Sequence, residues 1–355
     1  MAAKYRFVEY DILRGFAISV MLMANSSAYV LQITPPFYLR LPGSFAAPIF
    51  MMLAGMMLAF ERQPKPSRGL SIIGAGCLID VAVWQIIPFV TFDVLYVIGF
   101  GIVFTTFPAR RLSVLWLWVG GLAFFVAGAA LRDTLGYHQD VFEIPIPTDR
   151  HFADFATVYP RIFQQFLLDG WFPLLPWVGF LWLGAGLQRS LATHPRPPVR
   201  NANDRRTWMP PSWGLAWAVI LVISARFWAS TFTLPEPRMG YSELFYPPTL
   251  GYCLTAASVT AIAFFACQQA IRVQLVRNLL SPFSWMGQHS LLMYFVHLVV
   301  IRYLLSTHFT TDRLSGFFKI IVITWFGLVI LAGILARFDR RKKASLGKAQ
   351  AQKPD

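Results

Sequence analysis

The sequence predicts an all-α fold, a polytopic bundle of about ten transmembrane helices with both termini in the cytoplasm. Three observations support this prediction. Apolar residues make up 56% of the 355-residue chain and charged residues only 14%. The apolar residues come in runs of roughly 20, the length that an α-helix needs to cross a bilayer. Basic and acidic connections alternate between these runs, as the topology of membrane proteins requires.

The first apolar run follows Lys4 and Arg6, an arrangement that secretory signal peptides share. The run also contains Asp11 and Arg14 and continues to Ile33 without a small-residue cleavage site. We therefore expect a retained first helix. The other apolar runs follow in order, and the shorter ones are expected to tilt or to have partly buried ends. The predicted spans are residues 10–32, 44–60, 70–89, 93–108, 114–132, 173–189, 212–232, 249–271, 284–305 and 317–336.

The connections between these spans fall into a basic set and an acidic set. The basic set holds Lys4 and Arg6, Arg62 to Arg68, Arg110 and Arg111, Arg189 to Arg206, Arg272 and Arg277, and the tail from Arg337 to Lys353. The acidic set holds Asp93, the residues from Asp133 to Asp169, Glu236, Glu243 and Asp312. Because cytoplasmic loops carry the excess of Lys and Arg, both termini are predicted to be cytoplasmic. A chain that crosses the membrane an even number of times ends on the side where it began, so the predicted ten spans agree with this placement.

Two long connections organise the chain. The basic, proline-containing stretch 190–211 predicts a cytoplasmic linker between a first membrane bundle, 1–189, and a second, 212–336. The acidic, aromatic loop 133–172 is predicted to lie on the outer side, and its end, "RIFQQFLLDGWFP", suggests a short interfacial helix. Residues 337–355 are expected to form a basic cytoplasmic tail.

The charges and cysteines exclude some functional classes. A net charge of +14 would suggest nucleic-acid binding in a soluble chain, but here the basic residues stand at the ends of apolar runs, where topology explains them. We therefore expect the lipid bilayer, and no nucleic acid, as a partner. Cys77, Cys253 and Cys267 lie inside apolar runs, so neither a disulfide nor a thiolate metal site is expected.

Several polar groups lie at membrane depth, where each charged group costs about 2.5–3.5 kcal/mol on insertion scales. Asp11 and Arg14 are three residues apart and can pair on one helical face, as a structural ion pair or as part of a site. Asn25 follows about three turns later, in the polar patch "NSSAY", and is either a functional group or a structural interhelical hydrogen bond. Asp80 lies near the centre of the third span, with Arg14 as one candidate partner.

The ninth span, "SWMGQHSLLMYFVHL", carries a polar stripe. Ser290, Tyr294 and His297 are spaced by four and three residues, which places them on one helical face. A neutral imidazole in the body of a span can accept a proton or a hydrogen bond near neutral pH. The stripe therefore predicts either a cavity lined by these three groups or a hydrogen-bonded packing histidine.

Five blocks of the sequence resemble, in order, one family of membrane enzymes. They are "YDILRGFAISVMLMAN", "FAAPIFMMLAGMMLAF", "RGLSIIGAGCLIDVAVW" with "FDVLYVIGFG", "DGWFPLLPWVGFLWLGAGL" and "GQHSLLMYFVH". The family is that of the membrane acetyltransferases typified by lysosomal heparan-α-glucosaminide N-acetyltransferase and its bacterial relatives, within the wider acyltransferase-3-like group. The region that the blocks delimit, residues 10–297, covers more than half of the chain, although no block is specific alone.

The resemblance implies a multi-pass enzyme of a bacterial inner membrane, with a homodimer left open. It takes an acetyl group from cytoplasmic acetyl-CoA, as co-substrate and without a metal, and delivers it to a sugar or glycan on the far side. By position, Asp11 and Arg14 match the family's first-helix acid and base, and Asn25 matches its polar residue. Asp80 matches its buried acid, and His297 the histidine of its late block with Ser290 and Tyr294.

The sequence departs from the family at one point. The family's proposed catalytic histidine lies shortly after the first helix or at the start of the second, whereas this chain has no histidine before His138. Ser44 stands near that position. Three interpretations stay open: His297 supplies the base, transfer follows a different route, or transfer is lost.

The residue inventory fits acetyl transfer in outline. His297 is the candidate base, with Asn25 and Tyr294 as polar partners. The cytoplasmic arginines Arg62, Arg68, Arg110 and Arg111 are candidates for binding the CoA phosphates, although topology alone predicts them too. The rival classes are a proton-coupled transporter or lipid-carrier translocase that uses Asp80, Arg14 and His297 as a proton relay, and a non-catalytic membrane protein.

Overall fold

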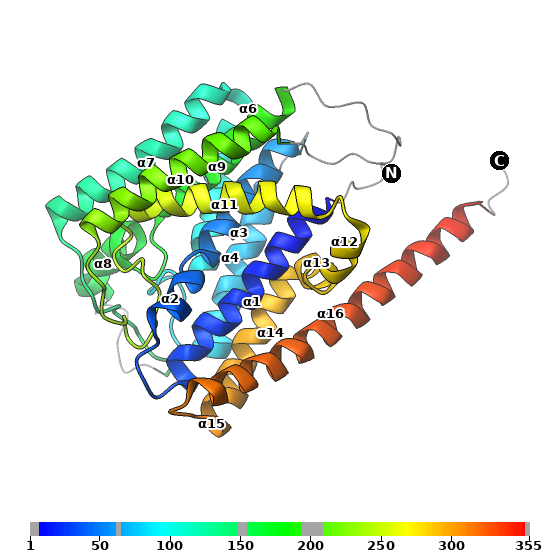
Figure 1. Ribbon diagram of the computed structural model, residues 1–355. Coiled ribbons are helices and arrows are strands. Elements are labelled where there is room, and N and C mark those ends of the chain that lie inside the picture. Colours follow the sequence, from blue (N-terminus) through cyan, green and yellow to red (C-terminus); the bar gives the residue numbers. More distant parts are fainter. Residues whose placement is uncertain (1–6, 62–64, 148–154, 194–208, 352–355) are drawn as a thin grey trace. The chain divides into compact units, whose positions relative to one another are not determined.

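The computed structural model describes residues 7–61, 65–147, 155–193 and 209–351 (Figure 1). In these ranges the chain is helical, and its only β-type pairs are isolated bridges such as Leu31 with Thr311. By internal contacts the chain forms two compact units. Unit 1 contains Met1–Ile33 and Ala266–Asp355, and unit 2 contains Thr34–Phe265. The predicted division at 190–211 stays a prediction, because most of that linker lies outside the described residues.

Unit 1 begins with α1 (Val8–Val30) and continues in the last part of the chain. Glu9 and Asp11 lie in the first turn of α1. Their negative charges interact favourably with the positive end of the helix dipole there. The later elements of unit 1 are α12 (Gln274–Leu279), α13 (Ser281–Gln288), α14 (Ser290–Val300), the π-helical η4 (Ile301–Leu305), α15 (Ser306–His308) and α16 (Leu314–Ala351).

Unit 2 holds most of the remaining helices. They are α2 (Phe37–Gly43), α3 (Ala46–Phe60), α4 (Ser67–Ile79), η1 (Asp80–Trp84), α5 (Val94–Thr106), α6 (Pro108–Arg111), α7 (Val114–Leu135), α8 (Phe155–Gln164), η3 (Gln165–Asp169), α9 (Leu174–Thr193) and α10 (Pro211–Thr231). The helix α11 (Leu250–Ala270) begins in this unit. Glycines set its closest packing: a side chain at Gly55 would collide with the backbone of Leu181, and one at Gly184 with that of Met52. Small residues of this kind let membrane helices approach closely.

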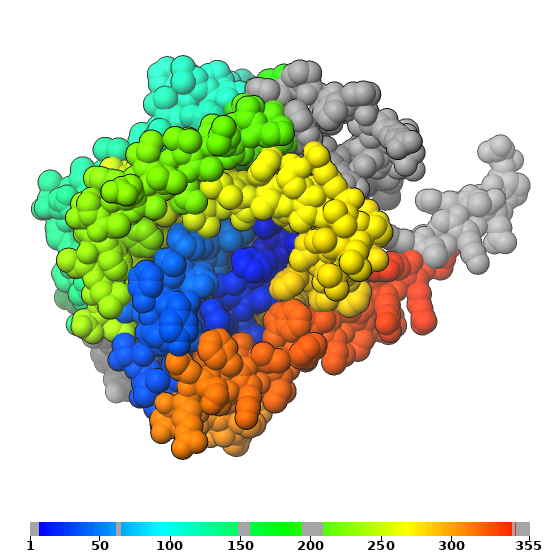
Figure 2. Space-filling model, viewed as in Figure 1, coloured from blue at the N-terminus to red at the C-terminus, as the bar shows by residue number. Residues whose placement is uncertain are grey.

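Eight helical stretches of the described chain are long and apolar enough to cross a membrane. Large apolar side chains are exposed along them, for example Val322, Phe326 and Ile330 on α16, which Figure 2 shows in orange and red. A helix that exposes such residues fits a lipid environment. The stretches are Phe37–Phe60, Ser67–Trp84, Val114–Leu135, Thr157–Thr193, Pro211–Thr231, Leu250–Ala270, Ser290–His308 and Leu314–Lys342. The protein is therefore an all-α, multi-pass membrane protein.

The number of spans and the side of the termini stay predictions. The eight stretches correspond to eight of the ten predicted spans and leave out 10–32 and 93–108. Both of these are helical, but α5 has only 13 residues, and α1 carries the charged side chains of Glu9, Asp11 and Arg14.

Three predicted elements differ from the structure in their extent. The predicted helix 284–305 is broken at His289, whose backbone angles (φ −117°, ψ 36°) end α13 before α14 begins. The predicted span 70–89 ends at Trp84, because Gln85 takes a left-handed conformation. The predicted basic tail is helical as far as Ala351, as a continuation of α16.

Candidate functional site

The break at His289 follows from a close contact between α1 and α13. A side chain at Gly15 would collide with the backbone of Phe283, and a side chain at Gly287 would collide with that of Asp11. The two pairs run in antiparallel order, so α13 packs against the first half of α1 backbone to backbone. Because α13 runs toward the start of α1, continuing the same helix would carry the chain past that end, whereas α14 starts anew and reaches the second half of α1.

The second half of α1 meets α14 at a polar pair. Asn25 Nδ2 lies 3.2 Å from His297 Nε2, and the His297 side chain is completely buried. On its other edge, His297 Nδ1 lies 3.3 Å from the carbonyl oxygen of Met293, one turn earlier in α14. The structure therefore brings together two residues, separated by most of the sequence, that were singled out as site candidates.

These contacts determine the protonation state of the imidazole. An amide nitrogen carries only donor hydrogens, so Asn25 Nδ2 donates and His297 Nε2 accepts. The carbonyl of Met293 only accepts, so the ring proton is on Nδ1, which donates to it. His297 is then neutral, with its basic lone pair on the edge that faces Asn25. One N–H of the Asn25 amide remains for another acceptor.

The other polar residues of the predicted stripe also belong to α14. Tyr294 is buried, and its ring meets the His297 ring edge-on with centroids 5.1 Å apart. Ser290 is half-buried and begins α14, about two turns before His297. On α1, Asp11 is buried and Arg14 is half-buried, both beside the contact with α13.

Asp80 lies in unit 2, at the start of the π-helical turn η1. Its carboxyl group is fully buried, and the hydroxyl of Tyr96 on α5 donates to Oδ2 at 2.5 Å. Among the described residues Oδ1 has no hydrogen-bond partner. Tyr96 is the side chain that binds Asp80, whereas the candidate partner Arg14 belongs to unit 1.

The candidate arginines lie at one end of the α4–α5 pair in unit 2. Arg68 is in the first turn of α4 and pairs with Glu61, while Arg110 and Arg111 form the end of α6, directly after α5. The antiparallel packing of α4 on α5 brings these positions to the same end of the unit. Arg62 lies outside the described residues.

Ser44, near the position of the missing family histidine, has a structural role. Its side chain is fully buried and donates to the carbonyl oxygen of Arg40 at 2.9 Å. The same hydroxyl accepts from the backbone N–H of Leu244 at 2.7 Å, and the Ser44 carbonyl accepts from Tyr252 Oη. A hydroxyl that both donates and accepts within the fold connects α2 to the loop before α11.

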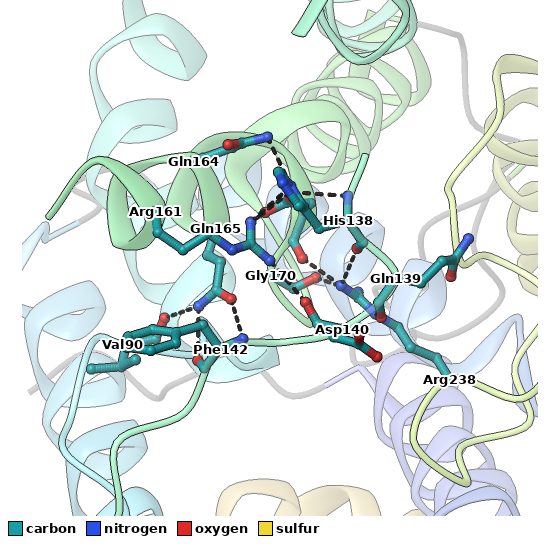
Figure 3. Close-up of polar contacts among 11 residues, drawn as sticks. Val90, His138, Gln139, Asp140, Phe142, Arg161, Gln164, Gln165, Gly170 and Arg238 are labelled. Atoms are coloured by element: carbon teal, nitrogen blue, oxygen red, sulfur yellow. Dashed lines mark hydrogen bonds and ion pairs between the residues drawn. The ribbon is translucent and has the colours of Figure 1, made fainter. Parts of the chain in front are cut away.

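A second polar cluster, which sequence reasoning missed, joins the loop after α7 to η3 and to the loop after α10 (Figure 3). Arg238 is buried and donates to the carbonyl oxygens of His138, Gln139, Asp169 and Gly170 at 2.6–3.0 Å. Its guanidinium also lies over the rings of Tyr137, Trp171 and Tyr246. The acceptors are backbone carbonyls, which no sequence motif marks.

Comparison with known proteins assigns the chain to a family. No curated protein matches the chain. The family model for the heparan-alpha-glucosaminide N-acetyltransferase catalytic domain matches residues 6–217, more than half of the 355 residues. The matched segment includes Asn25 and Asp80 but ends before His297. The chain belongs to the family of the heparan-alpha-glucosaminide N-acetyltransferase catalytic domain, a family of membrane acetyltransferases.

Proposed function

We propose that this protein moves an acetyl group from cytoplasmic acetyl-CoA to a sugar or glycan acceptor on the far side of the membrane. Membership of the family supports acetyl transfer as the reaction. The observation that assigns the proposed reaction to particular atoms is the 3.2 Å contact between Asn25 Nδ2 and His297 Nε2 in unit 1. Asn25 comes from the family-matched segment, and His297 comes from the part of the chain beyond it.

His297 is proposed as the proton acceptor. Acetyl transfer to a hydroxyl or an amine requires a base that takes the nucleophile's proton as the new bond forms. The Nε2 lone pair of His297, which accepts from Asn25 in the structure, is proposed to take this proton when the Asn25 amide turns to the substrate, because the ring proton is on Nδ1. The carbonyl of Met293 holds the ring in this tautomer, and the edge of Tyr294 packs against it.

Asn25 is proposed to stabilise the oxyanion. The acceptor oxygen or nitrogen attacks the carbonyl carbon of the thioester, and its proton moves to His297 Nε2. Negative charge then develops on the carbonyl oxygen, to which an Asn25 N–H donates. The carbon–sulfur bond breaks as the carbonyl re-forms, and CoA leaves as a thiol after taking the proton from His297. Atoms and charges balance without a further reactant.

Supporting roles are proposed for other candidates. Asp11 and Arg14 hold the first half of α1 at the α13 contact, and Ser290 and Tyr294 extend the polar face of α14. Asp80 holds Tyr96 and thereby the α4–α5 pair. Arg68, Arg110 and Arg111 are proposed to bind the CoA phosphates, since guanidinium groups form paired hydrogen bonds with phosphate oxygens. Arg62 completes the proposed set.

The test uses inverted membrane vesicles that contain the full chain and enclose a glycan acceptor. Acetyl-CoA with a labelled acetyl group is supplied outside, at the cytoplasmic face. We expect label on the enclosed glycan, and we expect His297→Ala to lower its rate of appearance about 10²–10⁴-fold, the usual contribution of a general base. His308→Ala is the matched control, because His308 is an exposed histidine of the same unit.

Three outcomes would contradict the proposal. Uptake of an unmodified substrate without covalent labelling would support the carrier alternative. An intact transfer rate in His297→Ala would show that another group is the base. Absence of transfer by the unaltered chain, with the protein folded in the vesicles, would support the non-catalytic alternative.

A further inference from the structure

The segment 137–146 of unit 2 has no regular secondary structure, yet side chains hold it from several directions. Gln165 accepts from the N–H of Phe142 at 2.5 Å and donates to the Phe142 carbonyl at 3.1 Å. Further along, Ile146 donates to the Gln85 carbonyl at 2.8 Å. Together with the bonds from Arg238, these contacts fix the loop before any ligand arrives. Preorganised groups bind with little loss of conformational entropy.

His138 stands at the start of this loop in an oriented position (Figure 3). Its Nδ1 lies 2.7 Å from Asp169 Oδ2, and its backbone N–H donates to the same oxygen at 3.2 Å. Asp169 is completely buried, whereas the His138 side chain is 51% exposed. A carboxylate can only accept, so Nδ1 carries the proton and donates to it. In the neutral ring, the lone pair is then on Nε2.

The buried Asp169 carboxylate is compensated by Arg161, whose Nη1 lies 2.7 Å from each carboxylate oxygen. Gln164 Nε2 lies 3.1 Å from His138 Nδ1, and Arg161 Nη2 donates to the carbonyl of Asp140 at 2.8 Å. With its proton on Nδ1, the His138 ring donates to Asp169, and the nearby Gln164 Nε2 and Arg161 Nη1 are contacts of Nδ1 and not hydrogen bonds to it. Within the described chain, no polar contact of Nε2 is seen. A buried carboxylate that orients a histidine and directs its acceptor nitrogen outward is the arrangement used to engage hydroxyl or amine groups.

We propose that His138, oriented by Asp169 and flanked by Gln164 and Asp140, forms a subsite that binds a hydroxyl or amine of an uncharged or cationic sugar. These four described residues belong to a connection that charge asymmetry predicts on the outer side. The inference rests on the proposed function for its ligand class, a glycan acceptor. It assigns the subsite to residues of unit 2 that belong to neither the Asn25–His297 pair nor the arginine set.

The charge of the loop sets the preferred ligand. Asp140 and Glu143 are exposed, whereas the nearby cations are paired or buried: Arg161 pairs with Asp169, Arg132 pairs with Asp133, and Arg238 is buried beneath the His138 carbonyl. The surface around His138 Nε2 is therefore acidic, and it opposes the approach of carboxylated or sulfated sugars. Uncharged sugars are not repelled by this surface, and a protonated amino sugar is attracted to it. Salt weakens this attraction, because the Debye length at 0.1–0.15 M ionic strength is about 8–10 Å.

The alternative is that the His138–Asp169 contact only ties the loop to η3. A tie of this kind would lower stability when removed but would not distinguish sugars by their charge. His138→Ala keeps the Asp169–Arg161 ion pair and the Arg238 contacts, so the variant is expected to fold. A binding measurement on a folded variant therefore separates the two roles.

The experiment measures sugar binding to the full chain in detergent micelles, without acetyl-CoA, by saturation-transfer NMR titration. The probes are methyl glucoside, methyl glucosaminide and methyl glucuronide, which are neutral, cationic and anionic. We expect the dissociation constant to rise in the order cationic, neutral, anionic. His138→Ala should raise it about tenfold for the first two probes, the effect of losing one good hydrogen bond of about 1.4 kcal/mol. Asp140→Asn should reduce the preference for the cationic probe.

The matched control is His308→Ala, an exposed histidine of unit 1 that leaves probe binding unchanged. Equal affinity of the unaltered chain and His138→Ala for every probe would overturn the subsite. Tightest binding of the anionic probe would overturn its charge preference. Since binding is measured without acetyl donor, loss of transfer in His297→Ala with probe binding intact leaves the subsite standing. If His138→Ala loses probe binding but the unaltered chain transfers no acetyl group, only the proposed function is refuted, and the subsite stands.

Discussion

Arg238 in unit 2 and His297 in unit 1 are both buried polar groups, but their hydrogen-bonding capacity is satisfied to different degrees. In unit 2, Arg238 gives hydrogen bonds to four carbonyl oxygens and is covered by three aromatic rings. In unit 1, His297 and Asn25 share one 3.2 Å hydrogen bond between neutral groups, and among the described residues the Asn25 amide shows no second acceptor.

The difference separates groups that hold the fold from groups that can react. Each hydrogen bond made within a buried network adds to the cost of removing the group, and a saturated group has nothing left to offer a substrate. A basic nitrogen that accepts a single neutral hydrogen bond can exchange that partner for a substrate proton. By this criterion Arg238 and Ser44 are structural, and the Asn25–His297 pair is the proposed site.

The largest expected effect is on the stability of unit 2, through Arg238→Met. The change leaves four carbonyl oxygens, those of Asp169 and Gly170 in buried contacts, without their donor and removes a cation from among three aromatic rings. We expect a loss of about 3–5 kcal/mol in the free energy of unfolding, which corresponds to a fall of roughly 10 °C in Tm. Thermal unfolding in detergent measures it.

Arg226→Met is the matched control for Arg238→Met, because Arg226 is exposed on α10. Its Tm is expected to stay within about 1 °C of the unaltered chain, as for most surface substitutions. Equal Tm values for both variants would show that the carbonyl contacts of Arg238 add nothing to stability.

The second effect concerns Glu243, in the loop before α11. Burial raises the pKa of Glu243 to about 7, and the nearby Arg40 guanidinium only partly opposes this. The folded state therefore keeps the proton between about pH 4.5 and 7, where the unfolded chain releases it. Stability is fully present below about pH 4.5 and falls by up to about 3 kcal/mol as the pH rises to 7.

Glu243→Gln should remove this slope, since the amide does not titrate. The measurement is Tm against pH between 4.5 and 8 for both proteins in the same detergent. Glu236→Gln is the control, an acidic residue of the same loop. A slope that persists in Glu243→Gln would assign the titration to another group.

The third effect is on activity, through Asn25→Leu. Removal of one oxyanion-stabilising donor typically lowers kcat about 10²–10³-fold. Stability should change by only about 1 kcal/mol, because a single neutral hydrogen bond is lost. Labelled acetyl transfer in inverted vesicles gives kcat, and Asn278→Ala on the exposed α12 is the control. A large fall in Tm with unchanged kcat would place Asn25 with the structural groups instead.

The positions of the helices followed from the sequence, whereas three of their boundaries did not. Apolar run length is a local property, and each predicted span is helical over most of its residues. The break at His289 depends on a contact between Gly287 and α1, and hydropathy does not say which helices touch. The glycines of "LRGF" and "WMGQ" were the available signal, but two separated glycines do not reveal their packing partner.

The candidate site was also predictable only in part, because sequence reveals local spacing along a helix but not which helices touch. Helical spacing placed Tyr294 and His297 on one face, and the resemblance to the family pointed to Asn25. That Asn25 and His297 meet required the tertiary fold. His138 and Asp169 were not recognised, because the carboxylate lies 31 residues along the chain and its role depends on burial. Topology alone predicts the cytoplasmic arginines, and only activity measurements can show whether they also bind the CoA phosphates.

The smallest expected effect concerns those arginines, and it tests whether unit 2 contributes to the reaction at all. Arg110 and Arg111 are held loosely: Arg111 lies over the ring of Phe107, and both stand at the end of the four-residue helix α6. Changing both to Ala should raise KM for acetyl-CoA about three- to tenfold with kcat unchanged, and added salt should shrink the difference. Arg313→Ala, which removes an exposed charge from unit 1, should leave KM unchanged. If the double variant keeps its KM at low salt, these arginines serve topology alone, and the phosphates of CoA are bound elsewhere.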